Sequence, residues 1–272
     1  MEKFQLIPFL EIEGIGAASG IVYENNSLYI ISDNSTFLYH YNQTEKKYEK
    51  IKLFENSAEI VAKKDKPDFE AITVFENKLY LFGSGSTKKR NTRVTFNLLN
   101  NKIKETDLSK IYKRLIESIS IADNDLNIEG VIITDKIIYF FQRGNGANAQ
   151  NGIFCYDRIN KTVEFKLIKL PKINGIEATF TDAILIEDTI YFLAAAENTT
   201  STYDDGEVMG SIIGTIDLKT MELKSSIQIS EKHKFEGLTL YKKTATQIEL
   251  LLCEDNDTED LVSTIYKLII EL

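Results

Sequence analysis

The chain has 272 residues, of which 43% are hydrophobic, and it contains three Pro and no Trp. This composition supplies enough apolar residues for a packed core and excludes a disordered or low-complexity chain. The 41 acidic residues outnumber the 32 basic ones, giving a net charge of −9. A surface of that sign disfavours nucleic acid or an anionic membrane as the principal partner.

The first ten residues are too short and too interrupted by polar side chains for a signal peptide. No apolar run approaches the roughly 18 residues that a membrane helix needs. Cys155 and Cys253 both fall in or beside strand-like runs, so we interpret them as buried free thiols rather than as a disulfide or metal pair. We therefore expect a cytoplasmic protein with no membrane partner.

A short motif recurs along the whole chain: an acidic or hydroxyl residue, then Gly or Ala, then a β-branched residue or Leu. Its copies open at Ser19, Glu70, Glu129 and Glu236, and a degenerate copy opens at Thr181. The intervals are 51 to 59 residues. A period of about 50 residues rich in short strands is typical of a β-propeller, because each unit is too small to bury its own faces.

Each unit reads as four strands in chain order. An apolar strand follows the opening residue, a polar hairpin such as Glu24-Asn25-Asn26 turns the chain, and a second apolar strand such as Leu79–Phe82 returns it. A third strand, such as Phe37–Tyr41, alternates in polarity. A fourth, such as Tyr48–Leu53, carries the alternating Lys and Glu of an exposed edge.

The fifth unit ends after its third strand, and the segment from Phe4 to Ile12 supplies the missing one. We therefore predict an all-β, five-bladed β-propeller of four-stranded antiparallel blades, formed by residues 1–272 as one domain and closed by the N-terminal strand in the last blade. A helical insertion near 107–118 explains the longest interval. An open sandwich and a six-bladed ring are the alternatives.

In a propeller the first strand of each blade lines the central channel, and the hairpin returns the second strand to the same face. The opening residue and the residue about fourteen positions later should therefore lie close together at one channel mouth. The predicted pairs are Ser19 with Asp33, Glu70 with Ser84, Glu129 with Arg143, Thr181 with the region of Glu197, and Glu236 with the region of Asp255. Asp182 is a further candidate ligand residue, and Glu177 takes the place of the acid that the fourth unit lacks.

Several carboxylates at a narrow mouth repel one another unless something neutralises them. A divalent cation held by Glu70, Glu129, Glu177 and Glu236 is one answer, and oxygen ligands suit Ca²⁺ or Mg²⁺ rather than zinc. Arg143, paired with Glu129 or Glu70, is a second answer. The third is that the carboxylates accept backbone hydrogen bonds and are structural. The sequence leaves all three open and makes no cofactor certain.

Two loops at the same position of adjacent units combine backbone flexibility with cations. Gly83 to Asn91 carries Lys88, Lys89 and Arg90, and Gln142 to Gly152 carries Arg143 and Asn145. Backbone amides beside cations suit a phosphate, carboxylate or sugar. The alternative is that both are solvated hairpin loops. The chain has two histidines and no Gly-x-Ser-x-Gly motif, which excludes a His-rich metal centre and disfavours a Ser-His-Asp triad.

The motifs Glu70-Ala71, Glu129-Gly130 and Glu236-Gly237, with the loops at Gly83 to Ser86 and Gln142 to Asn145, resemble those of the phytase-like propellers. That group includes β-propeller phytases, proteins described as having esterase-like activity of phytase, SdiA-regulated proteins and uncharacterised bacterial propellers. The resemblance implies mouth carboxylates that hold calcium ions and bind a phosphate ester. This chain departs from it in having five predicted blades rather than six and in lacking a dense Lys/Arg phosphate site.

Three functions follow. The preferred one is binding of a small polar or anionic ligand at the acidic mouth, by Ser19, Asp33, Glu70, Ser84, Arg90, Glu129, Arg143, Asn145, Asp182 and Glu236. The second is a divalent-metal-assisted hydrolase of a phosphate ester, lactone or other ester, in which a mouth Glu acts as general base. The third is a scaffold that binds a protein partner. The fold alone does not choose among them.

Overall fold

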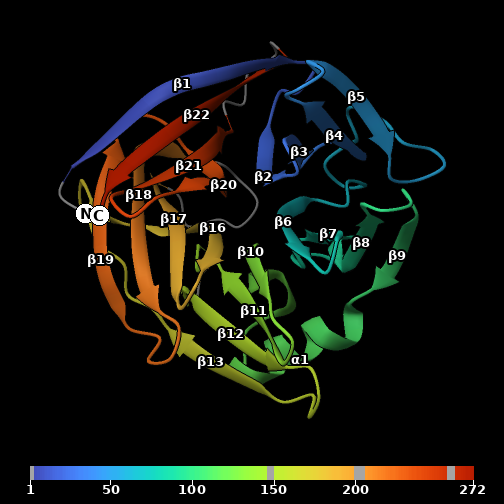
Figure 1. Ribbon diagram of the computed structural model, residues 1–272. Coiled ribbons are helices and arrows are strands. Elements are labelled where there is room, and N and C mark those ends of the chain that lie inside the picture. The colour runs from blue at the N-terminus through green and yellow to red at the C-terminus, as the bar shows by residue number, and fades with distance from the viewer. Residues whose placement is uncertain (1–2, 146–149, 199–205, 256–260) are drawn as a thin grey trace.

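The computed structural model describes residues 3–145, 150–198, 206–255 and 261–272. In these residues, five four-stranded antiparallel sheets surround a central axis and form a five-bladed β-propeller (Figure 1). The predicted fold is confirmed, and the open sandwich and the six-bladed ring are excluded.

The first three blades use consecutive strands. Blade 1 is β2 (Ala18–Glu24), β3 (Ser27–Ser32), β4 (Phe37–Asn42) and β5 (Lys47–Lys52). Blade 2 is β6 (Phe69–Phe75), β7 (Lys78–Gly83), β8 (Thr92–Asn97) and β9 (Ile103–Asp107). Blade 3 is β10 (Ile128–Ile133), β11 (Ile137–Gln142), β12 (Gly152–Asp157) and β13 (Val163–Leu167).

The last two blades complete the ring. Blade 4 is β16 (Thr179–Ile186), β17 (Thr189–Asn198), β18 (Glu207–Asp217) and β19 (Leu223–Ser230). Blade 5 is β20 (Phe235–Lys243), β21 (Gln247–Glu254), β22 (Val262–Glu271) and the N-terminal strand β1 (Phe4–Glu13). Strands β1 and β22 pair from Phe4 opposite Ile270 to Glu13 opposite Val262, so the ring closes as predicted and both strands gain a partner along their length.

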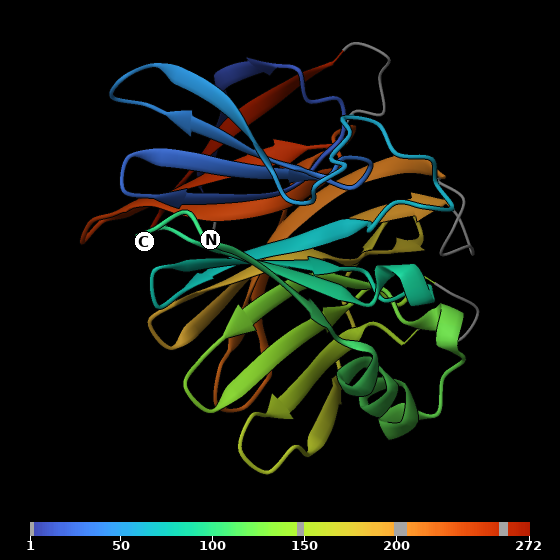
Figure 2. The ribbon, with the colours of Figure 1, turned by 90° about the vertical axis from the view of Figure 1, so that its right-hand side faces the viewer.

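Polar two-residue turns join the first two strands of a blade. Asn25 and Asn26 in blade 1 have φ of 51° and 58°, and Glu76 and Asn77 in blade 2 have φ of 49° and 56°. Two successive left-handed residues match the right-handed twist of the strands they join, and Asn tolerates that conformation better than most residues. Figure 2 shows these hairpins on the left-hand face of the ring and helix α1 (Ser109–Ile119) toward the right-hand one.

The opening residue of every repeated motif is a β-bulge. In each blade the pairing of the first two strands breaks by one residue, and the residue left out is Ser19, Glu70, Glu129, Thr181 or Glu236. A bulge leaves its residue outside the regular ladder and redirects its side chain. The repeat read from the sequence is therefore a repeated break in the innermost strand pair of each blade.

The small residue after the bulge is required by the close approach of neighbouring blades. A Cβ on Gly130 would lie 2.9 Å from the backbone nitrogen of Ala183, and one on Gly237 would lie 2.8 Å from the Cα of Gly20. Neither contact is with a side chain that could move away. In blade 4, Asp182 stands at this position and uses its carboxylate to bind the next blade, as described below.

The apolar core consists of five clusters, one at each interface between neighbouring blades. The second strands, such as β11, are almost fully buried because they contribute to clusters on both of their faces. Helix α1 covers the interface of blades 2 and 3, where it buries Tyr112 and Leu115 and where the Tyr112 hydroxyl donates to the carbonyl of Gly83 at 2.7 Å. Cys155 and Cys253 are free thiols.

Three short elements complete the described chain: the 3-10 helices η1 (Lys88–Arg90) and η2 (Asp123–Asp125), and the small hairpin of β14 (Lys172–Ile173) and β15 (Ile176–Glu177). Within the residues described, none of the helices has the length and apolar character required to cross a membrane.

Candidate functional site

A repeated backbone hydrogen bond brings polar side chains to one mouth of the channel. In blades 2, 3 and 5 the residue two positions before the bulge accepts, through its carbonyl, the N–H of the residue that follows the second strand. These bonds run from Ser84 to Asp68 at 2.9 Å, from Arg143 to Asn127 at 2.9 Å, and from Asp255 to Lys234 at 3.2 Å. The bulge residue lies beside each pair, so every such blade contributes three side chains to the same place.

The first group of charges, here called the Lys66 cluster, joins blades 1 and 2. The Lys66 ammonium contacts the carboxylates of Asp33 and Asp68, the latter at 2.8 Å. Arg90 Nη1 lies 2.7 Å from the Asp68 carboxylate and 2.8 Å from the Ser86 hydroxyl. Asp68 is buried and also accepts a hydrogen bond from the Ser84 hydroxyl. Both cations are therefore already neutralised by carboxylates.

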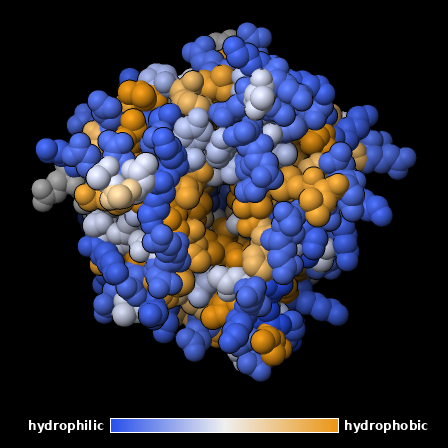
Figure 3. All heavy atoms as spheres, viewed as in Figure 1, coloured by the Kyte–Doolittle hydropathy of each residue, from blue (hydrophilic) through white to orange (hydrophobic). Residues whose placement is uncertain are grey.

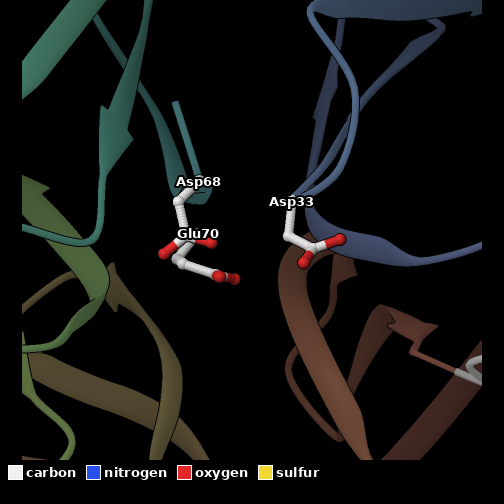
Figure 4. A group of neighbouring side chains, drawn as sticks. All are labelled: Asp33, Asp68 and Glu70. Atoms are coloured by element: carbon white, nitrogen blue, oxygen red, sulfur yellow. The ribbon is translucent and has the colours of Figure 1, made fainter. Parts of the chain in front are cut away.

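Glu70 lies at the edge of this cluster without a counter-ion. One of its carboxylate oxygens lies within 4.8 Å of oxygens of Asp33 and Asp68, and Figure 4 shows Asp33 facing the other two across the space between blades 1 and 2. Across the described residues, no hydrogen bond or ion pair to the Glu70 side chain is found. Burial raises the pKa of Glu70 well above its ordinary value, and the neighbouring carboxylates of Asp68 and Glu129 raise it further.

The second group, the Arg143 cluster, joins blades 3, 4 and 5. Arg143 binds Glu129 of its own blade at 3.2 Å and Glu197 of the next blade at 2.6 Å. Lys234 continues the chain of charges, with its ammonium 2.9 Å from Glu197 and 2.8 Å from Glu236. It also lies 3.4 Å from Asp255, and Asn127 donates to Glu129 at 2.7 Å.

The two clusters contain more carboxylates than cations. Seven carboxylates face four cations: Asp33, Asp68, Glu70, Glu129, Glu197, Glu236 and Asp255 against Lys66, Arg90, Arg143 and Lys234. In the described part of the chain the mouth is therefore an acidic site.

Burial changes the proton affinities of the mouth carboxylates. Burial raises the pKa of Glu129 to about 7 although Arg143 opposes the shift, and burial raises that of Glu236 to about 8 although Lys234 opposes it. Burial also favours a higher pKa for Glu197, but Arg143 and Lys234 together hold it below its ordinary value. Two mouth carboxylates thus exchange protons near neutral pH, where a general acid or base is most effective.

Where the opening residue of the motif is Ser or Thr rather than Glu, that residue has a different role. The Ser19 hydroxyl donates to the carbonyl of Phe69 in the next blade at 2.5 Å, and the Thr181 hydroxyl donates to that of Phe235 at 2.7 Å. Asp182 accepts the backbone N–H of Leu238 in the next blade and that of Ala183, both at 2.7 Å. Opening residues with a hydroxyl therefore form hydrogen bonds between neighbouring blades, whereas the carboxylates of the opening Glu residues lie at the mouth.

The structure brings together most of the residues predicted for the mouth. Asp33, Glu70, Ser84, Arg90, Glu129, Arg143 and Glu236 all belong to the two clusters. Asn145 lies beside them, with its side-chain oxygen 3.5 Å from Asn127 Nδ2. In detail, Ser84 contacts Asp68 rather than Glu70. The part of the second loop at residues 146–149 lies outside the described residues.

Among the described residues, three of the predicted ones take no part in the ion pairs of the two clusters. Ser19 and Asp182 are occupied by the inter-blade hydrogen bonds given above. Glu177 is exposed on β15, where it pairs with Lys172. The small hairpin carries Glu177 out of the blade, so its nearness in sequence to the fourth opener does not bring it to the mouth.

Lys66, Asp68, Asn127 and Lys234 are the mouth residues that the repeat did not reveal. A signal for three of them exists in the sequence, because Asp68, Asn127 and Lys234 each stand two positions before a Glu opener. All three are buried. On a regular strand, a polar residue at that position would be expected to face solvent. A polar residue two positions before the Glu of the motif therefore marks a blade that contributes to the mouth.

The carboxylate oxygens of Asp33, Asp68 and Glu70 have the chemistry and the spacing to hold a hard divalent cation. Lys66 contacts two of the three, so a cation bound by the whole set would share Asp33 and Asp68 with the ammonium or displace it. The three carboxylates can therefore hold such an ion, which would compete with the Lys66 ammonium for Asp33 and Asp68.

Comparison with known proteins identifies the family and the fold. The model of a family described as "Family of unknown function (DUF6929)" matches residues 14–270. Among curated proteins, none matches the sequence.

Solved structures resemble the chain at the level of the propeller. A glutaminyl cyclase from Myxococcus xanthus aligns with a TM-score of 0.56 and 10% identity over 98% of this chain and 97% of its own. A luciferin-regenerating enzyme gives 0.54 and 10% over 98% and 95%. An exo-1,5-α-L-arabinanase from a bovine ruminal metagenomic library gives 0.54 and 11% over 96% and 94%. At these identities the likeness concerns the fold alone.

Proposed function

Because the chain belongs to DUF6929, a family of unknown function, we propose a function from the site itself: it binds a small polar ligand at the acidic channel mouth. The ligand presents a positive charge or several hydrogen-bond donors to the carboxylates there. An amine, a polyhydroxyl compound and a hydrated divalent cation all meet that description.

The observation that carries the proposal is the state of Glu70. Its carboxylate is partly buried, faces two further carboxylates and, among the described residues, has neither an ion pair nor a hydrogen bond. Such a group is costly unless a proton or a ligand compensates it. A bound donor or cation would supply the missing interaction and lower the pKa of Glu70 toward its ordinary value.

The charge balance supports a donor-rich ligand over an anionic one. Lys66, Arg143 and Lys234 each contact at least two carboxylates, and Arg90 contacts Asp68. A phosphate or carboxylate would have to compete with these partners for every cation. Of the two ligand types suggested by the sequence, polar and anionic, the polar one fits the pairing better.

The test measures thermal unfolding against named probes. Putrescine, glucose, CaCl₂, MgCl₂ and sodium phosphate are each added to the wild-type protein and to Glu70→Gln. A ligand at 100 times its Kd stabilises the folded state by about 2.7 kcal/mol, which corresponds to a rise in Tm of about 5–10 °C. We expect a rise with a donor or cation that is lost in Glu70→Gln and retained in the exposed control Glu45→Gln.

Two results would contradict the proposal. One is a response to phosphate alone. The other is a response to a donor that is equal in wild type and Glu70→Gln.

The second candidate is a divalent-metal-assisted hydrolase of a phosphate ester, lactone or other ester, in line with the resemblance to phytase-like propellers. The three-carboxylate group of Asp33, Asp68 and Glu70 favours it, and Glu129 or Glu236 would serve as general base. When bound, Ca²⁺ or Mg²⁺ would polarise the ester and lower the pKa of a coordinated water.

The hydrolase candidate predicts that EDTA lowers the Tm and that Ca²⁺ or Mg²⁺ restores it, together with metal-dependent hydrolysis of p-nitrophenyl phosphate or p-nitrophenyl acetate. Either Glu129→Gln or Glu236→Gln should abolish the hydrolysis, and both variants should retain the metal-dependent rise in Tm. Metal-independent turnover would refute this candidate without affecting the first.

A further inference from the structure

The end of the channel opposite the acidic mouth opens into a cavity of about 390 Å³, lined by residues of all five innermost strands. Figure 3 views the ring from the side of the β2–β3 hairpin and shows hydrophobic residues gathered around a central hollow. The surface of the cavity is nevertheless about equally polar and apolar. This space is here called the hairpin-end chamber.

The polar part of the chamber wall comes from the backbone. The innermost strand of each blade pairs on one side only, so its other edge carries N–H and C=O groups that no sheet uses. These strands are β2, β6, β10, β16 and β20, and residues of all five line the chamber. Main-chain donors and acceptors therefore surround the space.

The register of the hairpins shows which residues present these groups. In an antiparallel pair, hydrogen-bonded and non-hydrogen-bonded residues alternate, and the pair that closes a two-residue turn is hydrogen-bonded. The neighbouring residue of the inner strand therefore turns its N–H and C=O away from its own sheet. In blades 1 to 4 that residue is Tyr23, Val74, Ile133 or Leu185, and all four line the chamber.

One of these groups has a partner in the neighbouring blade. The Tyr23 N–H donates to the Thr239 hydroxyl of blade 5 at 2.9 Å, which confirms the direction derived from the register. In the described part of the chain, the N–H groups of Val74, Ile133 and Leu185 have no such partner. These donors are available to a molecule inside the chamber.

The side chains of the wall disfavour charged and heavily hydroxylated molecules. Glu24 is the single charged residue among the described residues that line the chamber, so an anion would meet no cation there. A cation would meet one carboxylate, against seven at the acidic mouth. A sugar would turn some of its hydroxyl groups against aliphatic side chains, where they lose water without replacement. Every blade contributes such a side chain: Val22, Val74, Ile132, Ile184 and Leu240.

We propose that the hairpin-end chamber binds one small, uncharged ring that carries an amide group, such as a lactam or a pyrimidinedione. In such a ring the amide N–H and C=O lie side by side at one edge, and they complement the C=O and N–H that a free strand edge presents. The rest of the ring packs against the aliphatic side chains. The chamber has the volume of an ordinary small-molecule pocket. The site is distinct from the acidic mouth, and its test is independent of the function proposed there.

The experiment is isothermal titration calorimetry of the wild-type protein with uracil, δ-valerolactam and cyclo(Gly-Gly). At least one of these probes should bind saturably, with one molecule per chain. Each probe is compared with its N-methylated counterpart, which keeps the ring and the carbonyl groups but has no amide N–H. Methylation should weaken binding about tenfold or more, because acceptors of the strand edges would lose their donor.

The backbone contact is tested by changing one strand edge. Val74→Pro removes an edge N–H without taking a hydrogen bond from the sheet, at a kind of position where Pro is tolerated. It should weaken binding of the probe about tenfold, whereas Val74→Ala, which keeps the N–H, should stay within about twofold of wild type.

A second variant keeps the test valid if Val74→Pro does not fold. Thr73→Trp places a large ring in the chamber and should prevent binding, whereas Thr162→Trp, at an exposed position before β13, should not change it. Glu70→Gln should bind the probe as wild type does, because the acidic mouth is a separate site. The proposal is overturned if none of the three probes binds saturably, if N-methylation leaves the affinity unchanged, or if Thr73→Trp binds like wild type.

Discussion

Arg143 of blade 3 and Glu197 of blade 4 form a buried ion pair, with Nη2 and Oε2 2.6 Å apart, although the two residues are 54 positions apart in the chain. The same guanidinium binds Glu129, so one cation compensates carboxylates from two blades. Arg143 is thus both part of the mouth and a connection between blades.

Replacing Arg143 by Met should lower the free energy of unfolding by about 3–5 kcal/mol, because Glu129 and Glu197 would lose their shared counter-ion in a buried place. Urea denaturation measures the change. Arg114→Gln, at an exposed position of α1, should change stability by about 0.5 kcal/mol or less. If adding Glu129→Gln and Glu197→Gln to Arg143→Met restored none of the lost unfolding free energy, the loss would not be caused by uncompensated charge.

Stability should fall as pH rises from about 5 to 8. The pKa values of Glu129 and Glu236 are raised to about 7 and about 8, so in this range the folded protein binds more protons than the unfolded chain. The free energy of unfolding therefore decreases with increasing pH, and each unit of pKa shift corresponds to about 1.4 kcal/mol. Urea denaturation at several pH values measures this slope.

Glu236→Gln should reduce the total loss of unfolding free energy between about pH 5 and 8 by an amount on the order of 2–4 kcal/mol. Glu45→Gln, at an exposed turn, should retain the wild-type slope. Equal slopes in Glu236→Gln and wild type would show that Glu236 does not hold its proton in the folded state.

The inter-blade hydrogen bond of Thr181 can be tested by an isosteric change. Thr181→Val keeps the packing but leaves the carbonyl of Phe235 without its donor, and it should cost about 1–3 kcal/mol. Thr73→Val is the matched control, since Thr73 lies on the equivalent innermost strand β6 and its side chain makes no hydrogen bond among the described residues, and we expect it to be neutral or stabilising. Comparable losses in both variants would assign the cost to the Thr-to-Val change itself.

The closure of blade 5 can be tested by circular permutation. Deleting residues 1–13 removes β1, exposes the edge of β22 and should leave a protein that aggregates or melts at least 10 °C lower. Joining residue 272 to residue 1 by a short Gly/Ser linker and opening the chain between residues 13 and 17 turns β22 and β1 into a hairpin. That permutant should remain monomeric with a Tm near wild type, and aggregation of it would show that the order of the strands matters as well as their pairing.

The sequence predicted the blade number because it depends on local patterns, and it predicted the ring closure because the last unit lacks the one strand that the N-terminal segment can supply. Polar turns and apolar runs recur at a nearly fixed interval, and the opening residue of the motif marks the bulge in every blade. The same repeat predicted the contact of Glu129 with Arg143, since a fourteen-residue hairpin fixes their relative positions.

The remaining charges could not be read in this way, because they depend on contacts between blades. Lys66 precedes its strand in a loop and meets Asp33 of blade 1, and Lys234 joins Glu197 of one blade to Glu236 of the next. The different roles of Ser19 and Glu70 at equivalent bulges also depend on whether a carbonyl of the neighbouring blade lies within reach. Such information is distributed over segments about fifty residues apart.

The pairing of β1 with β22 has a consequence for biosynthesis. Blades 1 to 4 are each made of consecutive strands, so they can form in order as the chain leaves the ribosome. Strand β1 is synthesised before all of them, yet its partner is synthesised last. Throughout translation β1 remains an unpaired strand that contains Ile7 and Leu10, and the final step of folding joins segments separated by nearly the whole chain, which is the slowest kind of contact to form.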